Sequence, residues 1–236
     1  MQYWNKPNFE GLLRLSVELD AHPDLEPLAS YCRFREQGLR RQAFSELERF
    51  LEASRAFDSA TASAAAIDIL ESNARARGVH QFLAQPLVAG FLMPTLRKWQ
   101  DEEPHSSLPV RWLGILSGDI ELLAKALSMC PEDKPVRRLL IDHDLSCADY
   151  ATHHLDETRF IGNIGEVMAA LDHARSLMAS APDSEGLASL ESELHYFDAL
   201  IADWQAYMRE PAGSFPEWCV KQGRKYGFPI KVYYKS

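Results

Sequence analysis

The chain has 236 residues, 46% of them hydrophobic and 25% charged, an ordinary composition for a folded protein with a substantial core. Its 34 acidic and 25 basic side chains give a formal charge of -9, which argues against binding to the phosphate backbone of a nucleic acid. No apolar run approaches the ~20 residues that cross a bilayer, and residues 1–11 lack the basic and apolar regions of a signal peptide. The four cysteines form no CxxC pair. We therefore expect a cytoplasmic protein with reduced thiols and no cofactor.

Amphipathic helices are predicted along the first hundred residues. Apolar side chains recur three and four positions apart from Asn8 to about Asp20, and two further helices follow the breaks at Pro23 and Gly38. Pro86 opens another helix, and Pro94 inside that helix predicts a kink, because a proline ring clashes with the carbonyl one turn earlier. The kinked helix is predicted to follow the core; a pocket wall is the alternative.

Residues 109–130 predict a helical hairpin. Pro109 suits the first turn of a helix, and Gly118 is suited to end that helix. Asp119 can cap the next helix, and Pro131 ends it. The polar segment 101–107 before the hairpin is the best candidate for a boundary between subdomains.

The hairpin resembles half of a tetratricopeptide repeat. The resemblance lies in the Gly118-Asp119 turn, in the exit Ala126-Leu127-x-x-x-Pro131, and in Trp112-Leu113-Gly114 as an altered form of the Trp-x-x-Leu-Gly pattern. It implies stacked antiparallel helical hairpins, as in an α-solenoid, with an irregular bundle as the alternative. We therefore predict an all-α fold of about ten helices with a short extended segment at the C-terminus.

The segment 142–157 is the densest run of potential ligands. Imidazole and carboxylate groups one helical turn apart suit a divalent transition metal or an acid/base pair. Adjacent His143 and Asp144 resemble the dyad of all-α metal-dependent phosphohydrolases, a family that also needs an upstream His and a downstream Asp. Here the candidates for those positions lack a distinguishing context. On this interpretation the chain is an all-α metal-dependent hydrolase that uses His143, Asp144, Asp149, His153 and His154.

The same segment also has a purely structural interpretation. His143 continues an apolar stripe and is then a core histidine. Ser146 with Asp149 has the pattern of a helix start, with a carboxylate in its first turn. His153 and His154 then lie at a helix end, where a cation is favoured. On this interpretation, which we favour, there is no metal site.

Two long helices are predicted after this segment. Asn163 and Glu166 have the spacing of a capping box, and Pro182 turns the chain. The apolar stripe of the first helix consists of Ile164, Val167, Met168, Leu171, Ala174 and Met178. The second helix has a heptad stripe of Leu187, Leu190, Leu194, Phe197, Ile201, Trp204 and Met208. Because the connection is short, we expect the two helices to pack against each other as an antiparallel pair.

The C-terminal tail has a different character. Residues 211–236 contain five Lys or Arg residues and one Glu, a local charge of +4. Apolar and aromatic residues alternate with others from Phe228 to Tyr234, the period of a strand. Such a strand needs a partner, which is residues 2–4, the same strand of a second subunit in a homodimer, or another protein. We favour a simpler interpretation, in which the tail covers the acidic helical body.

These patterns predict an organisation and two alternative functions. The organisation is an N-terminal helical subdomain (1–102), a helical-hairpin subdomain (108–210) and a basic aromatic tail (211–236), with a single domain as the alternative. The leading function is a cytoplasmic interaction protein, an adaptor or a neutraliser, whose partner has a basic surface. Its candidate partner-binding residues are Trp112, Tyr150, Trp218, Tyr226 and Tyr234. The alternative function is the metal-dependent hydrolase.

Overall fold

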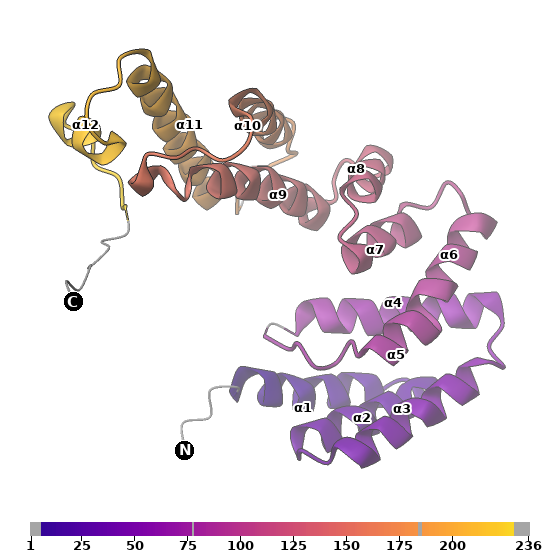
Figure 1. Ribbon diagram of the computed structural model, residues 1–236. Helices are drawn as coiled ribbons and strands as arrows, with labels where there is room; N and C mark the ends of the chain where they lie inside the picture. The colour runs from indigo at the N-terminus through magenta and orange to yellow at the C-terminus, as the bar shows by residue number, and fades with distance from the viewer. Residues whose placement is uncertain (1–5, 77, 184–185, 229–236) are drawn as a thin grey trace. The chain divides into compact units, whose positions relative to one another are not determined.

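The computed structural model describes residues 6–76, 78–183 and 186–228, and all regular structure in these ranges is helical (Figure 1). The predicted all-α fold is confirmed. The predicted strand, apart from Phe228, and the N-terminal residues 2–4 lie outside the described ranges. None of the described helices combines the length and the apolar character needed to span a bilayer.

The chain forms two compact units, Met1–Met129 and Cys130–Ser236. The polar segment 101–107, the predicted boundary, lies inside the first unit. The helices of unit 1 are α1 (Lys6–Asp20), α2 (Glu26–Glu36), α3 (Arg40–Ser54), α4 (Ser59–Arg75), α5 (Gln85–Leu87), α6 (Met93–Glu102), α7 (Ser107–Ser117) and α8 (Ile120–Met129). Helices α1, α2 and α3 pack in sequence order, and α4 contacts α1 and α6. Leucine and phenylalanine side chains fill the core between these helices.

The distortion predicted at Pro94 is present. Residues Val88–Leu92 form a π-helical turn just before α6, and the Met93 N–H bonds to the Val88 carbonyl. The wider turn accommodates a proline ring that a regular α-helix would exclude. The inner side of this turn is well packed, because Phe91 and Leu92 are buried in the core of unit 1.

The hairpin predicted from the glycine and proline punctuation is formed by α7 and α8. Gly118 ends α7 in the left-handed conformation (φ 68°). The Asp119 carboxylate accepts hydrogen bonds from the backbone N–H groups of Glu121 (2.9 Å) and Leu122 (3.1 Å) and so caps α8. The two helices cross closely, since a Cβ atom on Gly114 would lie 2.9 Å from Leu123 Cδ2. The hairpin is confirmed, whereas the stacking of such hairpins into an α-solenoid stays a prediction.

Unit 2 is built on four helices, α9 (Lys134–Thr152), α10 (Ile164–Ala179), α11 (Ala188–Arg209) and α12 (Phe215–Lys221). Helix α9 packs against both α10 and α11. Arg137 of α9 is buried and donates hydrogen bonds to the carbonyl oxygens of Leu177 (2.7 Å) and Pro131 (2.8 Å) and to the Ser180 hydroxyl (2.8 Å). Arg137 thereby fixes the C-terminal end of α10 against α9.

The tail up to Phe228 covers one side of α11, in line with the favoured interpretation of the sequence. Phe215 is fully buried, with ring centroids 5.2 Å from Trp204 and 5.5 Å from Tyr207. The Tyr226 hydroxyl donates a 2.5 Å hydrogen bond to Asp203, whose carboxylate also lies 3.2 Å from Arg224 Nε. Aromatic packing and a shared carboxylate therefore hold the basic tail on the acidic helix.

Candidate functional site

The predicted ligand cluster at 142–157 lies mostly on one continuous helix. Helix α9 runs through Ser146 without a break, and the Ser146 hydroxyl donates to the Asp142 carbonyl (2.7 Å), so the predicted helix start at Ser146 is wrong. His143 is exposed and Asp144 is buried, so the prediction of a core histidine is also wrong. The buried face of α9 is displaced by one position from the predicted stripe, because α10 and α11 both pack on it.

The side chains of this cluster have separate partners. His143 Nε2 lies 3.9 Å from Cys147 Sγ. His153 Nδ1 lies 2.7 Å from the Tyr150 carbonyl oxygen. His154 Nδ1 lies 3.6 Å from a Glu157 carboxylate oxygen. In the described ranges, no group of three His, Cys, Asp or Glu side chains is placed to hold one metal ion. The hydrolase function stays a prediction.

Asp144 connects α9 to α10. Its carboxylate lies 2.8 Å from His173 Nδ1, a residue for which the sequence predicted no role. Burial raises the pKa of Asp144, while the hydrogen bond and the charge of His173 act in the opposite direction. The pair crosses between two packed helices, and it is explained as a structural contact.

Of the five predicted partner-binding aromatic residues, three contribute to packing. Trp112 is 4% exposed in the core of unit 1, and Tyr226 is bonded to Asp203. Trp218 stacks on Phe215 with ring centroids 6.1 Å apart. Tyr150 is 64% exposed, and Tyr234 lies outside the described residues. Partner binding by these five residues stays a prediction.

The most extended concave surface of unit 2 lies between α10 and α11. Three hollows of about 600, 130 and 370 Å³ follow one another along the helix pair; we call them together the α10–α11 groove. The first two hollows share Gln205 as a lining residue, and the last two share Arg175. The apolar side chains that line it are Phe160, Ile164, Met168, Leu171, Met178, Ala179, Leu187, Leu194, Ile201, Ala202, Trp204 and Met208.

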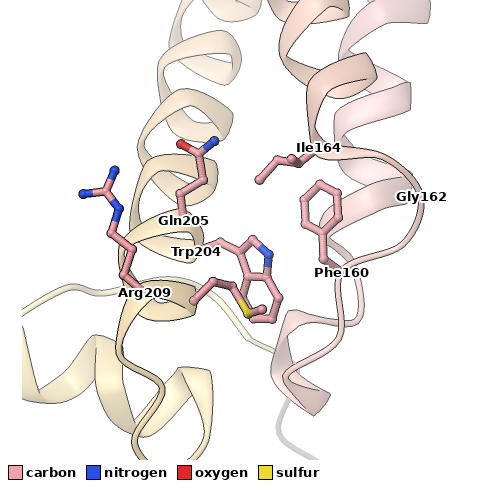
Figure 2. Close-up of a pocket in the computed structure, with 7 residues that line it drawn as sticks. Phe160, Gly162, Ile164, Trp204, Gln205 and Arg209 are labelled. Carbon is pink, nitrogen blue, oxygen red and sulfur yellow. The ribbon is translucent and has the colours of Figure 1, made fainter.

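The largest hollow has an aromatic wall (Figure 2). The rings of Phe160 and Trp204 lie nearly parallel, 6.2 Å apart at 17°. Ile164 and Met208 complete the apolar lining, and Arg209 provides a charged edge. We call this hollow the Trp204 pocket.

The loop that forms one wall of the Trp204 pocket is held in place by backbone contacts. Thr158 adopts a left-handed conformation (φ 59°), which is strained for a β-branched residue. Its hydroxyl oxygen accepts a 2.9 Å hydrogen bond from the Phe215 N–H, and the Ile161 N–H donates to the Ala151 carbonyl at 2.9 Å. The wall is therefore fixed by the fold before any ligand arrives.

Two polar bridges along the groove join α10 to α11. Arg175 of α10 donates two hydrogen bonds to the Asp198 carboxylate of α11, at 2.9 and 2.8 Å, and also pairs with Asp172. These carboxylates raise the pKa of Arg175. Nearer the Trp204 pocket, Gln205 Nε2 lies 3.3 Å from Met168 Sδ. Both contacts link α10 to α11, and the side chains of Arg175 and Asp198 are partly exposed.

Most of the apolar groove residues were missed as a site because the sequence assigns them to the core. Val167, Leu171 and Ala174 of the α10 stripe are buried, but Met168 is 42% exposed, and Met208 at the end of the α11 stripe is 55% exposed. The signal that could have revealed them is the width of the stripe on α10, where apolar residues occupy two adjacent flanks of the helix.

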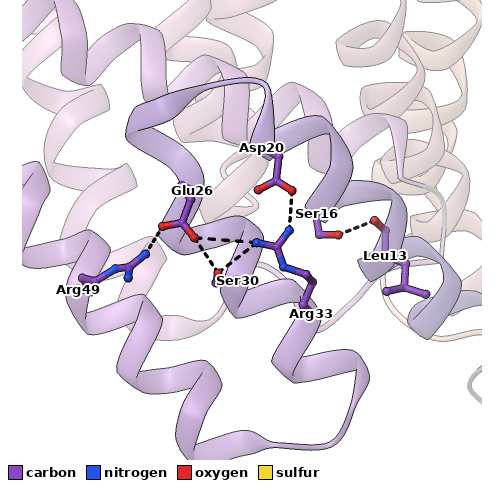
Figure 3. A network of polar contacts seen from close by, with 7 residues as sticks. All are labelled: Leu13, Ser16, Asp20, Glu26, Ser30, Arg33 and Arg49. Carbon is purple, nitrogen blue, oxygen red and sulfur yellow. Dashed lines mark hydrogen bonds and ion pairs between the residues drawn. The ribbon is translucent and has the colours of Figure 1, made fainter.

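Unit 1 contains the other dense polar cluster, which joins α1, α2 and α3 (Figure 3). Arg33 pairs with Asp20 at 2.5 Å and lies 3.1 Å from the Ser30 hydroxyl. Glu26 pairs with Arg49 and accepts a 2.9 Å hydrogen bond from Ser30. These side chains are half exposed and satisfy one another, and such pairs contribute about 0.2–1 kcal/mol each. This network is explained as a surface link between neighbouring helices.

Two further hollows have weaker claims to function. One of about 360 Å³ lies at the π-helical turn, where Phe57 and Phe91 form its floor and Lys98 lies at its edge. The other, of about 430 Å³, contains His143 and Cys147. The second hollow shares Gly162 with the Trp204 pocket but lies along α9.

We compared the chain with protein-family models, with curated proteins and with solved structures, and none of these comparisons finds a match. The function is therefore inferred from the residues and geometry of the chain itself.

Proposed function

We propose that the protein is a protein-binding module, an adaptor or a neutraliser, that holds a segment of its partner in the α10–α11 groove. The observation that carries this proposal is the groove itself, where Met168 (42% exposed) and Met208 (55% exposed) lie beside buried lining residues such as Trp204. A core stripe normally disappears into the fold, and an apolar groove with a polar rim is typical of an interaction surface.

The residue types in the groove favour a protein ligand. Met168, Met178 and Met208 are three of the six methionines in the chain. Methionine is flexible and polarisable, and it is enriched on surfaces that adapt to varied apolar partners. The Trp204 pocket adds a rigid aromatic site of the kind that anchors a side chain from a partner.

The dimensions of the groove favour a ligand of several residues. The hollows follow α10 from Ile164 to Ala179, and a helix of 16 residues is about 24 Å long at 1.5 Å per residue. A small metabolite would occupy one hollow, whereas a polypeptide segment can contact all three. The four free cysteines support a reducing compartment, and we propose the cytoplasm.

The test is partner capture with a groove variant and a matched control. Met168→Glu/Met208→Glu places two charges in the groove, and Val220→Glu places one on α12 at a residue that is 75% exposed and outside the groove. Purification from the organism that encodes the chain should recover one dominant partner with the wild type and with Val220→Glu. The groove variant should lose that partner while its circular dichroism spectrum and melting temperature stay unchanged. Equal recovery by the groove variant, or no recovery by any of the three proteins, would contradict the proposal.

A further inference from the structure

We infer that the segment bound in the α10–α11 groove is a basic amphipathic helix, aligned parallel to α11, that inserts a large apolar side chain into the Trp204 pocket. This inference rests on the proposed function and specifies the chemistry of the partner.

The shape of the groove selects a helix. Two antiparallel helices with spaces between their side-chain ridges accept a third helix, whose apolar residues recur at i, i+3, i+4 and i+7. The partly exposed Arg175–Asp198 bridge lies where two of the hollows adjoin, so the side chains of a bound segment would enter these hollows at separated points. An amphipathic helix presents apolar side chains about one turn apart in this way.

The charge of unit 2 selects a basic ligand. Unit 2, residues 130–236, contains 17 acidic and 11 basic side chains, an excess of six negative charges, and the excess is ten in residues 130–210, before the basic tail. Along the groove, Asp172, Asp198 and Glu191 contribute carboxylates against the two cations Arg175 and Arg209, and Arg175 is already paired with the first two carboxylates. Lysine or arginine residues on the flanks of a bound helix would therefore be attracted, and an acidic helix would be repelled.

The ends of the groove determine the direction of the ligand. Arg209 lies at the Trp204 pocket, and in the described part of the chain it has no ion-pair partner. Glu191 lies at the opposite end, and it too has no ion-pair partner among those residues. A helix has partial negative charge at its C-terminus and partial positive charge at its N-terminus. The C-terminus of the ligand therefore lies near Arg209 and its N-terminus near Glu191, which is parallel to α11.

The described tail of the chain does not occupy this groove. Tyr226 and Arg224 bind Asp203. Asp203 lines none of the three hollows of the groove. The tail does show, however, that unit 2 binds a basic aromatic segment through acidic and aromatic side chains of α11.

The test uses three synthetic peptides of about 18 residues, five helical turns. The first peptide has leucine and one phenylalanine at the i, i+3, i+4 and i+7 positions and lysine elsewhere. The second replaces lysine by glutamate, and the third has the composition of the first with the apolar spacing scrambled. Fluorescence anisotropy at physiological ionic strength should show that the basic helix binds the full-length protein at least about tenfold more tightly than the other two. A groove variant without added charge, Met168→Gln/Met208→Gln, should lose about tenfold in affinity, and Val220→Gln on α12 should keep it.

The direction of the ligand is tested with a photoreactive group at either end of the basic peptide. A group at the C-terminus should crosslink to residues near Arg209, and a group at the N-terminus should crosslink near Glu191. The reverse pattern would overturn the predicted direction.

The outcomes separate this inference from the proposed function. If the groove variant loses a partner in capture but the three peptides bind equally or not at all, the basic-helix inference is overturned and the proposed function stands. If light scattering shows a dimer that the groove variant abolishes, the occupant is a second copy, and the inference is again overturned.

Discussion

The two sides of α11 differ in whether another segment of the chain covers them. One side carries Tyr196, Asp203 and Tyr207, and the chain's own segment 215–228 packs on it with aromatic rings and a shared carboxylate. The other side faces α10, and there Met208 of α11 and Met168 of α10, two residues that line the groove, remain exposed in the described structure. A single helix therefore shows both a completed apolar contact and an open one.

The open side of α11 has apolar residues, as the covered side does. Met208 and Leu187 belong to the same heptad stripe as the buried Leu194 and Phe197. What differs is whether a segment of this chain reaches them. The tail supplies Phe215, Trp218 and Phe228 to the covered side, and we propose that a partner supplies the equivalent side chains to the open one.

The largest effect is expected on the covered side. Phe215→Ala removes a fully buried ring that contacts Trp204 and Tyr207, and we expect it to lower the free energy of unfolding of unit 2 by about 3–5 kcal/mol. Urea denaturation followed by circular dichroism measures the change. Val220→Ala on the same short helix is the control and should cost less than about 0.5 kcal/mol. Similar losses from both would mean that the tail is not packed as described.

A smaller effect with a distinct pH signature is expected at Tyr226. Burial, and after it the hydrogen bond to Asp203, raises the pKa of Tyr226 above its usual range. A pKa raised in the folded state gives stability that is present below the unfolded-state pKa of about 10 and is lost as pH rises above it. Wild-type stability should therefore fall more steeply above about pH 10 than that of Tyr226→Phe. At neutral pH the variant should lose about 1.5–3 kcal/mol, the value typical of a hydrogen bond to a charged group.

Identical slopes for the two proteins between pH 9 and pH 11, measured by denaturation at a series of pH values, would show that the Tyr226–Asp203 contact does not form in solution. In that case the tail would be held by aromatic packing alone.

On the open side, the Arg175–Asp198 bridge between α10 and α11 is expected to contribute less to the free energy of unfolding. Arg175→Met removes the two hydrogen bonds to Asp198 and should lower the free energy of unfolding by about 1 kcal/mol or less, because both groups are partly exposed. The effect should shrink in 1 M salt. Arg138→Met, which removes an exposed pair with Asp142 inside α9, is the matched control and should change stability by no more than about 0.5 kcal/mol.

The smallest effect on stability is expected from the groove residues themselves. Met208 is 55% exposed, so Met208→Ala should change the free energy of unfolding by no more than about 0.5 kcal/mol. The same substitution should weaken partner binding, because it removes part of the lining of the Trp204 pocket. A loss of stability close to that of Phe215→Ala would show that the open side is packed in solution and would remove the contrast between the two sides.

The sequence predicted the elements of this fold closely, because local signals determine them. Gly118 ends α7 and Asp119 caps α8, and Pro94 follows the π-helical turn directly before α6. Asn163 caps α10, where its side chain accepts a 2.7 Å hydrogen bond from the Gly165 N–H. Each of these helix ends, caps and turns depends on the conformational preferences of one or two residues. The local sequence is therefore sufficient to predict them.

The candidate site was not predictable in the same way. The apolar stripe on α10 includes Val167, Met168 and Leu171. The pattern does not predict which of these side chains a neighbouring helix buries. The exposure of His143 and the burial of Asp144 likewise follow from the two helices that pack on α9, and not from the stripe alone. A periodic pattern fixes the faces of a helix, while its neighbours decide which flank is buried.

The sequence by itself determined that this chain is helical, acidic and able to bury a core, because propensity, periodicity and charge are properties of residues and their spacing. Only the tertiary structure decided that one side of α11 is covered and the other is open. That outcome depends on whether segments distant in sequence, such as the one around Phe215, reach a given face, and contacts of this kind leave no periodic trace in the sequence.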